Sequence, residues 1–396
     1  MNQETNRTLQ REIDLLAPEI VETLQELVRI PSITGDEARM GATVAQRCRD
    51  MGFAVEIIES MPGRPNVLAT WDSGLPGPTL LLNDHLDIVP PGPLEYWTHP
   101  PFAAEIADGC VFGRGTIDTK SGLTTILMAV RAIRGLNVPL RGKLKLLFTC
   151  DEEVGGRHGI QHVAAQGLLS ADLALVAEPT TMQVEIATKA RMTVEITTRG
   201  VATHGARPWL GHNAIEDMML VMQRLQQHAH HLAERRDPLL GFATLNIGLI
   251  EGGTVPNMVP NKCRLQVDRR CLPSEKRAEV YAEFEALLDE LRQQHPKLDA
   301  SLNELIWWPG YKLDPDSPVI EHLSAAYEDV HGSRPVVAGK DAGTDASWIH
   351  SLAGIPVVMF SPGNGLRAMN ADENVNIDDM IRATKVVGQF VLRVLG

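Results

Sequence analysis

Histidine and carboxylate side chains follow several apolar runs of this sequence directly. The first of these motifs is His85-Leu86-Asp87, which comes after the run Thr79–Asn83. Residues i and i+2 of a strand share a face, so His85 and Asp87 would project together from the carboxyl end of a buried strand. His85 could then bind a metal ion while Asp87 orients its ring. Taken alone, the triplet is more typical of a structural histidine than of a metal ligand.

Two further motifs place carboxylates in turns. Asp118 lies in the turn 113–122, whose glycines allow the sharp bend needed to aim Asp118 at a cation. The spacing of those glycines matches neither the Walker loop nor the dinucleotide fingerprint. The acidic segment Asp151-Glu152-Glu153 follows the apolar run Leu144–Thr149. Adjacent side chains point in different directions, so one Glu could bind metal while its neighbour faces the water that the metal activates.

The fourth motif is Glu178, which directly follows the apolar run Leu173–Ala177. Carboxyl ends of parallel strands meet at one edge of a sheet, so the expected fold brings these side chains into one crevice. Histidine and carboxylate ligands without cysteine suit Zn²⁺, and also Mn²⁺ or Co²⁺, in an open catalytic site. Such an ion lowers the pKa of a water from ~15.7 to ~7. The pattern therefore indicates a metal-dependent hydrolase.

The elements that must position these residues fall into two groups. Four apolar runs without polar alternation predict strands that are buried on both faces of a mainly parallel sheet: Thr79–Asn83, Leu144–Thr149, Leu173–Ala177 and Pro356–Phe360. Between about 189 and 303, alternating runs predict an antiparallel sheet with one polar face, accompanied by helices at about 213–234 and 274–295. We expect an α/β fold with helices on both faces of the sheet (residues 1–188 and 304–396), interrupted by a smaller α+β domain (189–303).

Composition excludes several classes of partner. The 37 Lys and Arg against 50 Asp and Glu give a net charge of −13, which argues against nucleic acid or an anionic membrane as partner and favours a small-molecule substrate. The five cysteines form no Cys-x-x-Cys pair, so neither a disulfide framework nor a thiolate zinc site is expected. No signal pattern and no apolar run of ~20 residues is present, which predicts a cytoplasmic protein without membrane attachment.

Together these motifs resemble the co-catalytic zinc amidohydrolase and metallopeptidase family of acetylornithine deacetylase, succinyl-diaminopimelate desuccinylase, aminoacylase and the glutamate carboxypeptidases. The resemblance covers nearly the whole chain. It implies that His85, Asp118 and Glu178 hold one ion and that Asp118 bridges to a second ion, which Glu153 also binds. It further implies that Glu152 is the general base.

The resemblance extends to the insert through the segments Gly200–Pro208, Gly211–Ile215 and Gly252–Pro260. In the family this domain is a lid that also forms the dimer. A histidine at the position of His204 reaches across that dimer to stabilise the oxyanion, which a fixed donor can do at a gain of several kcal/mol. The resemblance thus implies catalytic or substrate-binding roles for four further residues: Asp87, His204, Asn257 and Arg270.

One departure from the family pattern concerns the last metal ligand. The family has a histidine just before an x-x-Asp/Asn-Glu segment, and Met369 stands at that position here, four residues before Glu373. A thioether is a poor ligand for hard or borderline dications. The second ion could be absent or weak, Asn370 or a water could substitute, or catalysis could use one ion. We expect a weakened second site, with one or two Zn²⁺ per chain.

The expected activity is hydrolysis of the amide bond of an N-acyl amino acid or a related small carboxylate-bearing amide by a homodimer. Metal-activated water would attack the carbonyl, with Glu152 as general base. Two alternatives remain open. One is hydrolysis of another C–N bond on the same scaffold, such as a dipeptide, a carbamoyl group or an amine that is deaminated. The other is a non-catalytic binding protein impaired at Met369.

Overall fold

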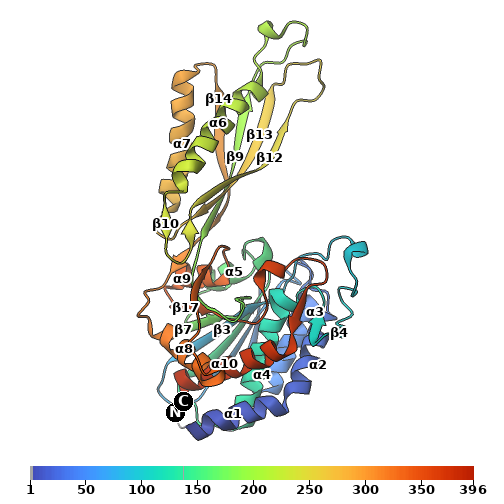
Figure 1. Ribbon diagram of the computed structural model, residues 1–396, viewed down its shortest axis with the longest axis vertical. Helices are drawn as coiled ribbons and strands as arrows, with labels where there is room; N and C mark the ends of the chain where they lie inside the picture. The colour runs from blue at the N-terminus through green and yellow to red at the C-terminus, as the bar shows by residue number, and fades with distance from the viewer. Residues whose placement is uncertain (1–2, 137) are drawn as a thin grey trace. The chain divides into compact units, whose positions relative to one another are not determined.

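The computed structural model describes residues 3–136 and 138–396, and the chain divides into two compact units (Figure 1). Unit 1 comprises Met1–Ile186, Leu313–Ala338 and Thr344–Gly396, and unit 2 comprises Ala187–Lys312 and Gly339–Gly343. The insert predicted at 189–303 therefore ends too early. The strand at Asp299–Trp308 belongs to the sheet of unit 2, and the chain leaves that unit only after it.

Unit 1 is built on a twisted central sheet whose strand order is β1-β2-β6-β3-β7-β17-β8, with β15 and β16 beyond β8. Strands β6, β3, β7 and β17 pair in parallel, and they are the four apolar runs predicted from the sequence. Because helices cover both faces, these strands need no polar alternation, and the prediction of a mainly parallel sheet is confirmed. The strands are β1 (Ala54–Glu59), β2 (Pro65–Asp72), β3 (Thr79–His85), β6 (Lys143–Thr149), β7 (Leu173–Val176), β8 (Val184–Thr188), β15 (Tyr311–Lys312), β16 (Val337–Lys340) and β17 (Val357–Met359).

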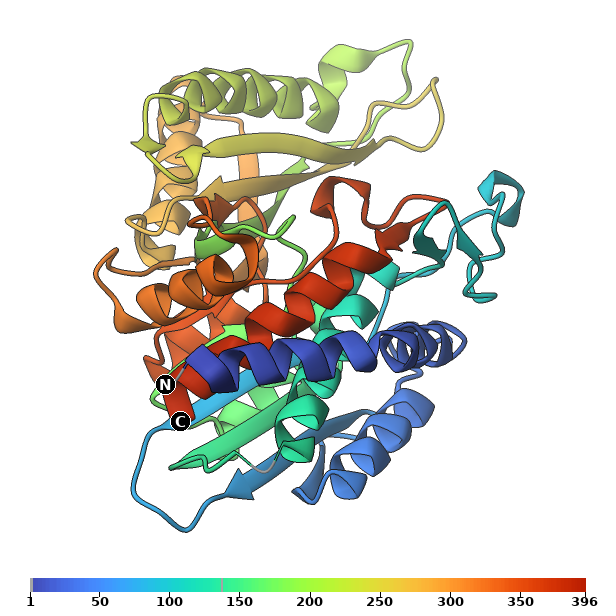
Figure 2. The same cartoon turned by 60° about the horizontal axis from the view of Figure 1, so that its bottom comes forward.

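Helices lie on both faces of this sheet. On one face α10 runs beside α4, α8 and α1 (Figure 2). The start of α4 approaches the sheet so closely that a Cβ on Gly122 would lie 2.2 Å from the Ala177 carbonyl oxygen, so only glycine fits there. On the other face α9 contacts β3, β7 and α5. The helices are α1 (Gln3–Leu15), α2 (Ala17–Val28), α3 (Ala38–Asp50), α4 (Ser121–Gly135), α5 (Ile160–Ala165), α8 (Pro318–His331), α9 (Asp345–Ala353) and α10 (Ile377–Leu395).

Strands β4, β5 and β18 form a small antiparallel sheet with β5 in the middle. In the chain, β4 and β5 come after the loop that follows β3, and β18 comes near the C-terminus. Its strands are β4 (Ile106–Ala107), β5 (Cys110–Phe112) and β18 (Asn374–Asn376). Since β18 pairs with β5, the C-terminal segment around 365–373 is tied to the turn that carries Asp118. Among the residues that the structure describes, no helix has the length and apolar character needed to span a membrane.

Unit 2 is an antiparallel sheet in the order β12-β13-β9-β14, with two helices packed on one face. Its elements are β9 (Ala190–Arg199), β12 (Thr244–Gly252), β13 (Lys262–Cys271), β14 (Asp299–Trp308), α6 (Ala214–Leu232), α7 (Arg277–Gln294) and the short pair β10 (Arg236–Asp237) and β11 (Gly241–Phe242). The side chain of Asn213 caps α6 by accepting from the backbone N–H of Ile215. The helix predicted from Ser274 begins instead after Lys276, and no side chain caps it.

Candidate active site

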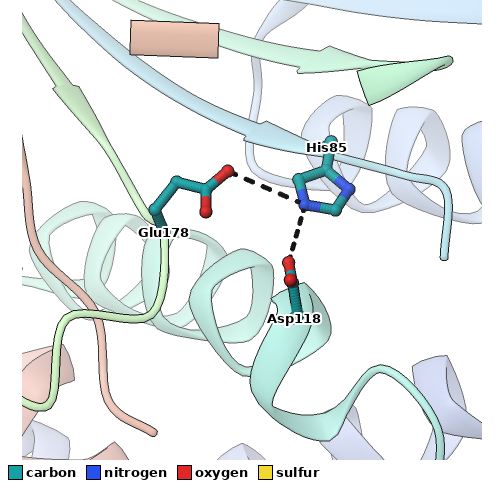
Figure 3. A group of neighbouring side chains, drawn as sticks. All are labelled: His85, Asp118 and Glu178. Carbon is teal, nitrogen blue, oxygen red and sulfur yellow. Dashed lines mark hydrogen bonds and ion pairs between the residues drawn. The ribbon is translucent and has the colours of Figure 1, made fainter. Parts of the chain in front are cut away.

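Three side chains of unit 1 converge at the carboxyl ends of the central strands: His85, Asp118 and Glu178 (Figure 3). Their ligand atoms all lie within 4.8 Å of one another. His85 Nε2 is 3.1 Å from Asp118 Oδ1 and 3.9 Å from Glu178 Oε1. His85 and Glu178 are buried, while Asp118 is partly exposed. One imidazole nitrogen and two carboxylates in this arrangement can hold a divalent cation.

Each of these side chains is placed by the end of a strand or by a turn. His85 is the last residue of β3, and Glu178 follows β7 by two residues. Asp118 lies in the turn Thr116–Lys120, where its own backbone is not helical, and Gly115 before this turn adopts the left-handed region at φ 83°. Glycine adopts that backbone conformation without the steric cost that a side chain would carry. The sequence therefore brings the three groups together through the strand order, as the motif analysis predicted.

Asp87 contacts the ring of His85 through both its backbone carbonyl and its carboxylate. Its backbone carbonyl accepts from His85 Nδ1 at 2.8 Å, while its carboxylate Oδ1 is 3.7 Å from that nitrogen. A carbonyl oxygen can only accept, so Nδ1 carries the proton and the lone pair of neutral imidazole lies on Nε2, toward the two carboxylates. The Asp87 carboxylate also accepts from the backbone N–H of Glu152 at 3.0 Å and of Glu153 at 3.3 Å. Asp87 thus positions the acidic turn as well as the ring.

Glu152 and Glu153 lie beside the three clustered side chains but are not part of that group. Burial raises the pKa of Glu152 well above its usual range, and the charge of Glu178 adds to the effect. Burial likewise raises the pKa of Glu153 to about 9, with the charge of Asp118 next in size. Among the described residues Glu153 Oε1 has no hydrogen-bond partner although it is buried. With all of these carboxyls ionised, the site would carry more negative charge than the chain neutralises, and it therefore fits a bound cation.

This charge excess predicts a pH-dependent stability of the metal-free protein. The pKa of Glu153 is about 9 in the folded chain against 4.5 for the free side chain, so the folded state binds more protons between those values. Stability must then fall as pH rises from about 5 to 9. His85, whose pKa is raised by Asp118 although burial opposes the shift, has the same sign. Thermal unfolding in chelator should show a midpoint that falls over this range, and added metal should largely remove the slope. An equal slope with and without metal contradicts the assignment.

The three remaining residues assigned by resemblance lie in unit 2. His204 Nδ1 accepts from the backbone N–H of Ala206 at 3.0 Å, and Gly205 N–H donates to the Asn257 carbonyl at 2.7 Å. The loops of His204 and Asn257 are therefore neighbours, and they border a cavity of about 570 Å³. Arg270 Nε donates to Asp268 Oδ1 at 2.8 Å, and Asp268 also pairs with Arg191. Arg270 is thus partly neutralised by its own strand.

Met369 is half-exposed and adopts a positive φ of 66°. Its carbonyl accepts from Arg114 Nη2 at 2.9 Å. The adjacent Asn370 is exposed, and its side-chain nitrogen lies 3.5 Å from the Leu366 carbonyl. Neither residue belongs to the cluster of His85, Asp118 and Glu178.

The sequence profile of Peptidase family M20/M25/M40 matches residues 81–393, which include every one of the motifs described above. The chain belongs to this family. It is accordingly a metal-dependent hydrolase that acts on amide C–N bonds, as the motifs and the family resemblance together predicted. The alternative of a non-catalytic binding protein loses its support.

Two curated relatives extend the likeness over most of the chain. The N-formyl-4-amino-5-aminomethyl-2-methylpyrimidine deformylase of Halalkalibacterium halodurans is 27% identical over 411 residues, covering 96% of this chain and 95% of that protein. The deformylase of the same name from Bacillus subtilis is 28% identical over 376 residues, covering 88% and 87%. Among solved structures, the Bacillus subtilis YXEP protein, described as a dinuclear metal binding peptidase of family M20, has a TM-score of 0.72 and 14% identity, with 96% of this chain and 99% of that chain covered.

Sequence reasoning missed two residues of this M20-type site. Glu373 is buried and its Oε1 accepts from the backbone N–H of Ile117 at 2.8 Å and of Asp118 at 3.2 Å. Its other oxygen pairs with the buried Arg114. Both residues belong to motifs that drew attention, the Gly113-Arg114-Gly115 turn and the Asp372-Glu373 pair. No local sequence pattern marked either residue for this contact.

Proposed function

We propose that this hydrolase releases a small acyl group from nitrogen, with an N-acyl amino acid or a related carboxylate-bearing amide as substrate. The observation that carries the proposal is the convergence of His85, Asp118 and Glu178 beside the buried Glu152. His85, Asp118 and Glu178 would bind a first ion, and Asp118 with Glu153 would face a second, weaker position. Zn²⁺ suits this donor set, and Mn²⁺ or Co²⁺ could replace it.

When bound, the metal supplies Lewis acidity and makes water acidic enough to lose a proton near neutral pH. The remaining work falls to the chain. Glu152 takes a proton from the attacking water and returns it to the leaving nitrogen. Asp87 holds the backbone of Glu152 and keeps the proton of His85 on Nδ1. We assign His204 as a donor to the developing oxyanion, and Asn257 and Arg270 as contacts of the substrate.

A second candidate substrate is an N-formylated aminomethylpyrimidine. Both curated relatives are named as deformylases of that compound, and they match most of this chain. The pairing of Arg270 with Asp268 also favours this candidate, because a neutralised guanidinium is a weaker anchor for a substrate carboxylate. The reaction would still be hydrolysis of an amide at the same site.

Amine release from a panel of amides separates these candidates. The panel contains N-acetyl, N-succinyl, N-formyl, N-carbamoyl and aminoacyl amino acids together with the N-formyl aminomethylpyrimidine. We expect release from at least one class, its loss on chelation and its return with Zn²⁺, Mn²⁺ or Co²⁺. Preference for the pyrimidine over every amino acid would replace the first candidate by the second. Release that chelators leave unchanged contradicts both.

We further propose that unit 2 is a lid and dimerisation domain. Its strand β12 is an edge of the sheet, and Leu249 and Ile250 on that strand are exposed. Edge strands with exposed apolar side chains are suited to pairing with a second copy. Trp209 and Leu210, near His204, are also exposed. Sedimentation of the purified protein tests this proposal: a dimer is expected, and Ile250→Lys should shift it toward a monomer.

A further inference from the structure

A deeply buried ion pair near the site joins two segments that are far apart in the sequence. Arg114 and Glu373 are 259 residues apart, and their side chains are 2% and 0% exposed. Removing two charges from water is costly unless further hydrogen bonds satisfy them. Both Arg114 and Glu373 make such hydrogen bonds, and these bonds surround the turn that carries Asp118.

Glu373 holds the backbone of the turn that carries Asp118. One of its oxygens accepts from two successive N–H groups, those of Ile117 and Asp118, while the other receives the Arg114 guanidinium. Successive amides that point at one oxygen fix the orientation of the peptide between them. The side chain of Asp118 leaves the backbone at that point, and its carboxylate lies 3.1 Å from His85 Nε2. Glu373 therefore determines where this carboxylate lies.

Arg114 connects the same turn to two further segments. Its Nη2 donates to the Met369 carbonyl at 2.9 Å and lies 3.4 Å from the Pro91 carbonyl oxygen. Its guanidinium also lies over the Trp97 ring, with 5.2 Å between the guanidinium carbon and the ring centroid. Arg114 thus holds Glu373 against the turn, and its contacts with Met369, Pro91 and Trp97 fix its own position.

We propose that Glu373 is a positioning residue for the metal site and that Arg114 holds it in place. The pair acts through the backbone at Asp118 and contacts neither substrate nor metal. This inference rests on the proposed assignment of Asp118 as a metal ligand. Residues that orient ligands from behind in this way typically change metal affinity by about 10–100-fold when replaced.

The test is metal affinity of the full chain, with Glu373→Gln compared with Glu275→Gln as a matched control. Glu275 also pairs with a buried arginine, Arg269, and accepts from a backbone N–H, that of Leu272, but it lies in unit 2. Competition with a chromophoric chelator gives the Zn²⁺ affinity, and the visible spectrum of the Co²⁺-loaded protein reports on the ligand field. We expect about a 10–100-fold loss of affinity and an altered spectrum for Glu373→Gln. The control Glu275→Gln should keep both its Zn²⁺ affinity and its Co²⁺ spectrum, even if its unfolding midpoint in chelator falls as far as that of Glu373→Gln.

Two further variants keep the outcomes distinct. Arg114→Lys retains the charge but cannot reach Glu373 and Met369 together, so it should weaken metal binding in the same direction if Glu373→Gln does not fold. Asp118→Asn tests the assignment on which the inference rests. Unchanged affinity in Asp118→Asn overturns the metal site itself. If Asp118→Asn loses affinity while Glu373→Gln keeps both its affinity and its spectrum, only the positioning role is overturned. If Glu373→Gln does not fold, Arg114→Lys takes its place in this comparison.

Discussion

Replacing Glu152 by Gln should lower kcat for amide hydrolysis by about 10²–10⁴-fold, the usual contribution of a general base, and leave the metal content unchanged. The amide keeps the size of the side chain but cannot take a proton from water. Glu152 is 6% exposed and lies outside the cluster of His85, Asp118 and Glu178, so its loss removes no member of that cluster. The measurement pairs steady-state kinetics with metal analysis of the same samples.

Glu153→Gln is the control for this prediction, because the two residues are neighbours of the same type in the same turn. If Glu153 faces the second ion, its replacement should weaken metal binding, while Glu152→Gln should not. A Glu152→Gln enzyme with full kcat removes Glu152 from the mechanism. Loss of metal together with activity in Glu152→Gln would make Glu152 a ligand instead of a base.

Much of the fold could be predicted because buried parallel strands leave a direct trace in the sequence. β3, β6, β7 and β17 are apolar runs without alternation, since helices cover both of their faces. The edge strand β1 left no such trace, because most of its side chains are exposed or only partly buried. The boundary near 303 was misplaced for a related reason: β14 carries Leu305 and Ile306 as exposed residues, so its pattern did not resemble that of a strand with a buried face.

The site was predictable where chemistry follows a strand directly, and not where it depends on contacts over long separations. His85 is the last residue of β3 and Glu178 follows β7, so the strand order alone brings them together. The hydrogen bond from His85 to the Asp87 carbonyl could not be predicted, because a backbone carbonyl belongs to every residue type. Glu373 was missed because no local pattern reveals a partner 259 residues away.

Replacing Met369 by His should add a second tightly bound ion per chain. The affinity for this second ion should rise by at least about 100-fold, which is more than replacing a residue that only orients a metal ligand changes it. Imidazole is a good ligand for Zn²⁺ beside carboxylates, and a thioether is not. The backbone also favours the exchange. Met369 has φ 66°, a conformation in which histidine is several-fold enriched over most residues. The Arg114 bond to the Met369 carbonyl does not depend on the side chain.

Metal titration of Met369→His against the unaltered protein decides this prediction, with Met369→Ala as control for loss of the thioether alone. One tight ion in the unaltered protein and in Met369→Ala, and two in Met369→His, would show that this position limits the second site. Two tight ions in the unaltered protein would mean that other side chains complete the site, and Glu153 with Asp118 would then need a partner other than Met369. One ion in the unaltered protein and in both variants would mean that the segment around Met369 does not face the cluster when metal is bound. The position of that segment depends on Arg114, so the Met369→His and Glu373→Gln experiments probe the same part of the site from opposite directions.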